Sequence, residues 1–127
     1  MNAISSSFAA ASAADDTTAM RWHAVIDAAN VVAMLAGHEP EEMTPEIAGF
    51  PARVALAEAE RRQRAENGIA DLAAVLEPGL AALLSINSRG SDPKPAAKAL
   101  WREFTAARAA VLALVPIGSV TGLRRPL

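Results

Sequence analysis

Residues 51–86, PARVALAEAERRQRAENGIADLAAVLEPGLAALLSI, decide the fold class of this protein. Strong helix formers fill the stretch up to Glu77, and only Gly68 interrupts them. The first half carries the arginines and most of the glutamates, whereas the second half is apolar. After Gly68 the apolar residues recur with the spacing of one helix face, at Ile69, Leu72 and Leu76. The pattern predicts a long helix whose charged half is exposed and whose apolar half lies in the core.

A break is predicted near the end of this helix, at Pro78 and Gly79. Proline has no N–H to donate to the carbonyl four residues earlier, and its ring crowds the preceding turn. Residues 80–86 are therefore predicted to form a short, very apolar helix.

Two more helices are predicted on either side of this stretch. Residues 18–36 form the first, because polar side chains at 16–18 can cap its start and Gly37 suits its end. Residues 93–115 form the last, with Asp92 as its cap. Their apolar stripes predict the core: Trp22, Val25, Ile26, Ala29, Val32 and Ala33 in the first, and Ala97, Leu100, Trp101, Phe104, Val111 and Val115 in the last.

These elements predict an all-α fold, a small antiparallel bundle of three main helices plus one or two short helices. A chain of 127 residues is long enough for one modest core. We expect one helical-bundle domain at residues 16–116, a mobile N-terminal arm at 1–15 and a C-terminal tail at 117–127. The arm is rich in serine and alanine and has few large apolar side chains to offset the entropy lost on ordering.

Composition excludes several classes of function. The absence of cysteine removes disulfides, thiolate catalysis and zinc–thiolate sites. A net charge of −2 argues against a dedicated nucleic-acid binder, which usually has a strongly basic face. Abundant alanine, with arginine preferred over lysine, is typical of a GC-rich bacterial genome. No unbroken run of apolar residues is long enough to span a membrane. No basic region precedes an apolar one, as it would in a secretory signal. A cytoplasmic protein without membrane contact is expected.

One polar stripe on the first predicted helix is a candidate ligand site. His23, Asp27 and Asn30 share a helix face by their i, i+4, i+7 spacing, and Glu58 of the long helix can add a carboxylate. Such a set can bind a small ligand or act as an acid–base pair. Metal sites need three or more ligands, and no second metal-binding motif supplies them, so no metal or cofactor is predicted. The alternative, which we favour, is the solvated side of an amphipathic helix.

A cluster of arginines in the long helix is a candidate interaction surface. It comprises Arg61, Arg62 and Arg64. Interleaved glutamates predict three i,i+4 ion pairs: Glu58–Arg62, Glu60–Arg64 and Arg62–Glu66. This interleaving favours a salt-bridged, exposed helix over a phosphate-binding one.

Arg108 is exceptional because it lies inside the apolar stripe of the last helix. It can anchor a carboxylate or an anionic ligand. Alternatively its stem packs while its head reaches water, and this second interpretation is favoured. Residues 38–49, which are acidic and interrupted by proline, are expected to form a solvated linker.

No catalytic constellation is recognisable, so a non-enzymatic helical interaction protein is expected: an adaptor, accessory or chaperone-like module. Three helices offer a thin core for this much apolar surface. A homodimer joined through residues 31–35 and 80–86 is therefore predicted, with another protein as a second candidate partner. The alternative function is a small-ligand-binding or catalytic bundle that uses His23 and Asp27.

Overall fold

A computed structural model describes residues 3–118, with side chains from 17 to 118. This part of the chain contains five helices and no strand: α1 (Ala3–Leu35), α2 (Pro45–Ala48), α3 (Phe50–Leu56), α4 (Ala59–Ser88) and α5 (Lys94–Leu112). The prediction of an all-α fold with three main helices and short additional ones is confirmed. Residues 119–127 of the predicted tail lie outside the described residues.

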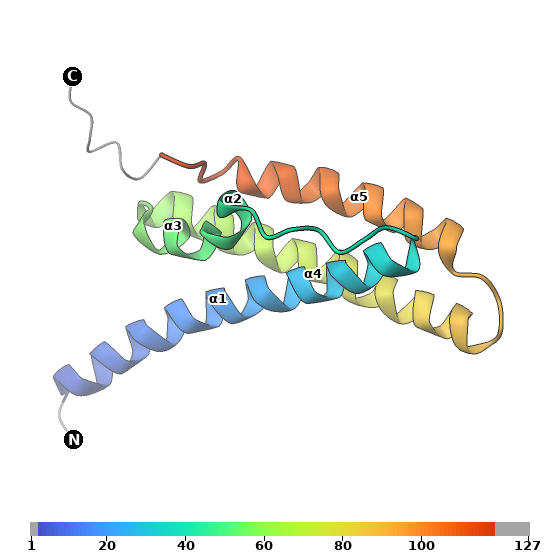
Figure 1. Ribbon diagram of the computed structural model, residues 1–127. Coiled ribbons are helices and arrows are strands. Elements are labelled where there is room, and N and C mark those ends of the chain that lie inside the picture. Colours follow the sequence, from blue (N-terminus) through green and yellow to red (C-terminus); the bar gives the residue numbers. More distant parts are fainter. Residues whose placement is uncertain (1–2, 119–127) are drawn as a thin grey trace.

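The three long helices contact one another in pairs (Figure 1). α5 runs antiparallel to both α1 and α4, and any bundle of three helices must then contain one parallel pair. Here the parallel pair is α1 and α4, because the connector after α1 runs back along the bundle to α2 before the chain enters α3 and α4 (Figure 1). α2 and α3 lie at the end of the bundle where α4 begins.

The first helix is longer than predicted. It begins at Ala3 and not near Thr18, so the backbone of most of the predicted N-terminal arm is helical. Alanine has the highest helix propensity, and no glycine or proline interrupts the chain before Gly37. Gly37 does end the helix as predicted. Its φ of 89° is left-handed, and the next N–H, that of His38, donates to the Ala33 carbonyl at 2.8 Å.

The long predicted helix is divided at a different place from the one expected. The break falls at Ala57 and Glu58, whose backbones are extended, and not at Pro78. No local breaker marks this position in the sequence. The break separates α3 from α4 and leaves Phe50 and Val54 buried at 0% and 1% exposure. Packing of α3 against both α1 and α4 therefore accounts for the division.

Pro78 lies inside the continuous helix α4. Its missing N–H leaves the Ala74 carbonyl without its helical donor. Both residues are exposed, so water can satisfy that carbonyl and the helix tolerates the proline. The short apolar helix predicted for residues 80–86 is thus the last part of α4.

The two glycines of α4 are positions of close approach to α5. A Cβ atom at Gly79 would lie 2.7 Å from Cδ2 of Leu100, and one at Gly68 would lie 3.0 Å from Cγ2 of Val111. No side chain other than hydrogen fits at Gly79 without displacing Leu100. The glycines that interrupt the helical pattern in the sequence are therefore contact residues of the bundle.

Replacing Gly79 with leucine is expected to lower the free energy of unfolding by about 2 kcal/mol, because overpacking forces α5 away from α4. Ala82→Leu, on the exposed side of the same helix, is the matched control and should change stability by less than about 0.5 kcal/mol. Urea denaturation followed by circular dichroism measures both. Equal stabilities of the two variants would contradict the close approach.

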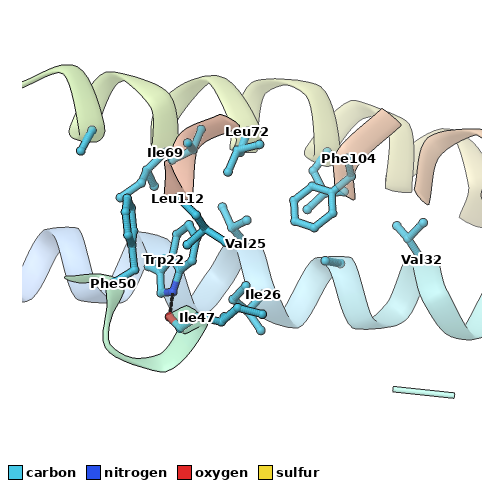
Figure 2. Packing of buried hydrophobic residues seen from close by; sticks show 14 of the residues in the cluster. Trp22, Val25, Ile26, Val32, Ile47, Phe50, Ile69, Leu72, Phe104 and Leu112 are labelled. Atoms are coloured by element: carbon cyan, nitrogen blue, oxygen red, sulfur yellow. Dashed lines mark hydrogen bonds between the residues drawn. The ribbon is translucent and has the colours of Figure 1, made fainter. Parts of the chain in front are cut away.

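Trp22 is fully buried in the core (Figure 2). Its ring centroid lies 4.8 Å from that of Phe50, and its Nε1–H donates to the Ile47 carbonyl at 2.7 Å. The predicted stripe of α1 is confirmed, since all six of its residues are buried. In the last helix Leu100 and Trp101 are half-buried and the other predicted core residues are buried. Trp22 thus joins α1 to the short helices α2 and α3.

Candidate functional site

The polar stripe of α1 faces away from the core. His23 and Asp27 are exposed and Asn30 is half-buried. His23 Nδ1 lies 2.8 Å from the Ala19 carbonyl oxygen, to which it donates a hydrogen bond within its own helix. Glu58 is exposed at the start of α4, and its side chain makes no capping bond there. The stripe therefore meets water rather than an enclosed pocket.

This arrangement supplies no converging ligand set. Within residues 17–118, whose side chains are described, no group of three or more His, Cys, Asp or Glu side chains is close enough to hold a metal ion. Glu58 forms no described bond with His23 or Asp27. The structure thus does not bring together the four residues that the sequence selected as a ligand site.

The arginines at the start of α4 have separate local roles. Arg62 Nη1 lies 3.3 Å from the Ala57 carbonyl oxygen and 3.5 Å from that of Ala55, and donates toward both, so it links α4 to the end of α3. Arg61 is half-buried. Arg64 lies 4.0 Å from Glu60, and this is the one predicted i,i+4 pair found among the described residues. Both side chains are mostly exposed, so the pair adds little stability.

Arg108 does not reach water as favoured from the sequence. It is 8% exposed, and it binds Glu41 of the acidic connector through two contacts. Nη1 lies 2.7 Å from Oε1, and Nη2 lies 3.0 Å from Oε2. Its guanidinium carbon also lies 5.3 Å from the ring centroid of Phe104 and 6.0 Å from that of Trp101. A two-contact geometry on an aromatic surface is the strong form of an arginine–carboxylate pair.

Residues 38–46 of the connector are exposed, as expected of a solvated linker, but the Arg108–Glu41 pair joins the connector to α5. Within residues 39–43, Glu41 is the residue with a described polar contact to the rest of the fold, and that contact is Arg108. The sequence signal was an arginine at a core position, because a buried charge needs an acceptor. Which of the connector's acidic residues supplies it depends on the path of the chain.

Arg53 joins α3 to the segment that follows α5. Its Nε donates to the Val115 carbonyl at 2.8 Å and its Nη2 to the Glu46 carbonyl at 2.9 Å. Burial lowers the pKa of the Arg53 guanidinium, and the negative charge of Glu46 opposes that shift. An arginine remains protonated at neutral pH despite such a shift. The buried Arg108 and the half-buried Arg53 are therefore both paired with acceptors within the fold.

An apolar groove lies along the contact between α1 and α4. Its volume is about 100 Å³, and its walls are mainly apolar, with Arg21 and Glu77 as the charged members. The remaining lining residues are Ala24, Val25, Ala28, Ala73 and Leu76. Small side chains in the walls allow another backbone to approach closely.

Two helical stripes border this groove and continue beyond it. On α1 the stripe is Ala24, Ala28, Val31 and Leu35; on α4 it is Ala73, Glu77, Leu80 and Leu84. Each set has the spacing i, i+4, i+7, i+11, so each keeps to one side of its helix. Leu84 is 48% exposed, and Val31, Leu35 and Leu80 are half-buried. We name these two stripes and the groove the α1/α4 face.

On α4 the large apolar side chains of Val75 and Leu84 are exposed, at 40% and 48%. One window of 18 residues is mostly apolar, and 22% of its residues are buried. By length and composition α4 could cross a membrane, which corrects the expectation that no apolar stretch is long enough. Asp71 and Glu77 interrupt this run, so the sequence contains no unbroken apolar segment of that length. Core helices of soluble proteins can be equally long and apolar, and α4 packs against α1 and α5.

Among the described surfaces, the α1/α4 face combines apolar exposure with a groove. The stripe at His23 and the arginines of α4 offer neither. Comparisons of this chain with protein-family models, with curated proteins and with solved structures found no significant match.

Proposed function

We propose that this protein is a non-enzymatic helical interaction module that acts as a homo-oligomer and binds through the α1/α4 face. The observation that carries the proposal is the apolar groove between α1 and α4, beside which Leu84 is 48% exposed and Val31, Leu35 and Leu80 are half-buried. Apolar surface removed from water stabilises an association by roughly 25 cal/mol per Å² before the costs of binding. A helix face of this kind is suited to pack against another helical surface.

The direction of the helices supports this proposal. Because α1 and α4 run in parallel, residues 31–35 and residues 80–86 come to the same end of the bundle (Figure 1). Two stretches that are far apart in the sequence therefore lie at the same end of the proposed surface. The α1/α4 face includes Val31 and Leu35 from the first stretch and Leu80 and Leu84 from the second.

The alternative function, a small-ligand or catalytic site at His23 and Asp27, gains no support from the geometry. Both side chains are exposed, and neither lines the groove between α1 and α4. A binding pocket encloses most of its ligand, and this stripe offers no enclosure.

The double variant Val31→Glu/Leu84→Glu tests the proposed surface. We expect the wild-type protein to be a dimer at micromolar concentration. The variant should dissociate at least about tenfold more readily, which corresponds to about 1.4 kcal/mol, because two charges would be buried in an apolar contact. Size-exclusion chromatography with light scattering measures the mass of each protein across a dilution series.

Leu56→Glu is the matched control, since Leu56 is 73% exposed on α3 and away from the α1/α4 face. It should dimerise like the wild type. Circular dichroism spectra should agree for all three proteins. A wild-type monomer at micromolar concentration would overturn the proposal, and so would a variant that dimerises as well as the control.

A further inference from the structure

We propose that a second copy of this chain occupies the groove of the α1/α4 face across a two-fold axis, with Arg21 of each copy paired to Glu77 of the other. This inference rests on the proposed function, because it specifies how two copies pair through the same surface. Three side chains that line the groove are small and let a facing helix approach closely: Ala24, Ala28 and Ala73.

Glu77 determines what the partner must supply. It is exposed, and it belongs to the otherwise apolar stripe of α4 that borders the groove. In the described chain it forms no hydrogen bond or ion pair. A purely apolar partner docked on this stripe would bury the carboxylate without compensation, which is costly. The partner therefore has to bring a cation to this place.

Arg21 is the complementary group on the same surface. It is exposed on α1, lines the same groove as Glu77 and has no described hydrogen-bond or ion-pair partner. The two charges bracket the groove along the bundle: Arg21 lies one turn before Ala24, and Glu77 lies one turn after Ala73. Each end of the groove thus has one charged side chain, and the two charges are of opposite sign.

A two-fold axis through the groove satisfies both charges at once. In an isologous dimer, residue i of one copy contacts residue j of the other, and j contacts i. With the axis midway between Arg21 and Glu77, each arginine faces the partner's glutamate, and two equal ion pairs form. The small residues of the two grooves then face each other between these pairs. The surface is therefore complementary to itself in charge as well as in polarity.

The charge-reversal variants Arg21→Glu and Glu77→Arg test this arrangement. Each variant alone would form two repulsive contacts in its own dimer, so its dissociation constant should rise at least about tenfold. An equimolar mixture should recover the wild-type affinity as a heterodimer. In that mixed dimer one contact joins the two introduced charges and the other joins the two native ones. Sedimentation equilibrium measures affinity, and native mass spectrometry separates the heterodimer by mass.

Arg102→Glu, at an exposed position of α5, is the control and should dimerise normally. Single variants that dimerise like the wild type would overturn the inference, and so would a mixture that stays monomeric. If this happens while Val31→Glu/Leu84→Glu dissociates, the proposed function stands and only the position of the axis is wrong. A monomeric wild type would overturn both. Recovery in the mixture would also show that both variants are folded.

Discussion

Replacement of Trp22 by alanine is expected to lower the free energy of unfolding by about 4 kcal/mol. Trp22 is fully buried, and its ring packs on Phe50 with 4.8 Å between the centroids. Removal of the indole leaves a cavity at the point where α1 meets α2 and α3. Domains of this size are stable by about 5–15 kcal/mol, so the loss is a large part of the total. Urea denaturation followed by far-ultraviolet circular dichroism measures it.

Two further variants separate the contribution of the Trp22 hydrogen bond from that of its ring packing and provide a control. Trp22→Phe keeps an aromatic ring but removes the Nε1–H that donates to the Ile47 carbonyl at 2.7 Å. It should cost about 1–3 kcal/mol, because the buried carbonyl loses its donor. Met20→Ala, in the same helix and 70% exposed, should change stability by less than about 0.5 kcal/mol. Equal losses in Trp22→Ala and Met20→Ala would contradict the burial of Trp22 in the core.

Replacement of Glu41 by alanine should destabilise the protein by about 2 kcal/mol, because it leaves the buried guanidinium of Arg108 without its counter-charge. The value is below that of a fully buried pair, since the Glu41 side chain is 39% exposed and water screens part of the attraction. Thermal or urea denaturation measures the loss. Glu39→Ala in the same connector removes an exposed carboxylate and serves as the control.

A double-mutant cycle with Arg108→Leu separates the ion pair from simple packing. The double variant Glu41→Ala/Arg108→Leu should be more stable than Glu41→Ala, because an apolar side chain on this aromatic surface needs no partner. The two substitutions should therefore couple by more than about 0.5 kcal/mol. Strictly additive losses would show that Arg108 and Glu41 act independently, contrary to the contact geometry.

The candidate surfaces could be predicted only in part. The stretches 31–35 and 80–86 are apolar in the sequence, but their placement at one end of the bundle depends on the parallel course of α1 and α4. The charges of Arg21 and Glu77 have no visible relation in the sequence, because they lie on different helices. His23 and Asp27 share a helix face by spacing alone. Spacing does not say whether that face meets water or a cavity.

What the sequence determined by itself was local. Periodic apolar residues and high helix propensity specify the helices and the buried face of each, as the fully buried stripe of α1 around Trp22 illustrates. Gly37 ends α1 because its left-handed backbone suits glycine. These outcomes need only interactions between residues a few positions apart.

The tertiary structure decided everything that depends on contacts between distant residues. It divides α3 from α4 at Ala57, where no breaker stands, and continues α4 through Pro78, where a breaker does stand. It also joins Arg108 to Glu41 across 67 positions. A break or a tolerated proline changes local energy by a few kcal/mol, which packing of a helix face can outweigh. Helix propensity therefore determines which segments can form helices. Burial of apolar faces determines where each helix begins and ends and which other helices it contacts.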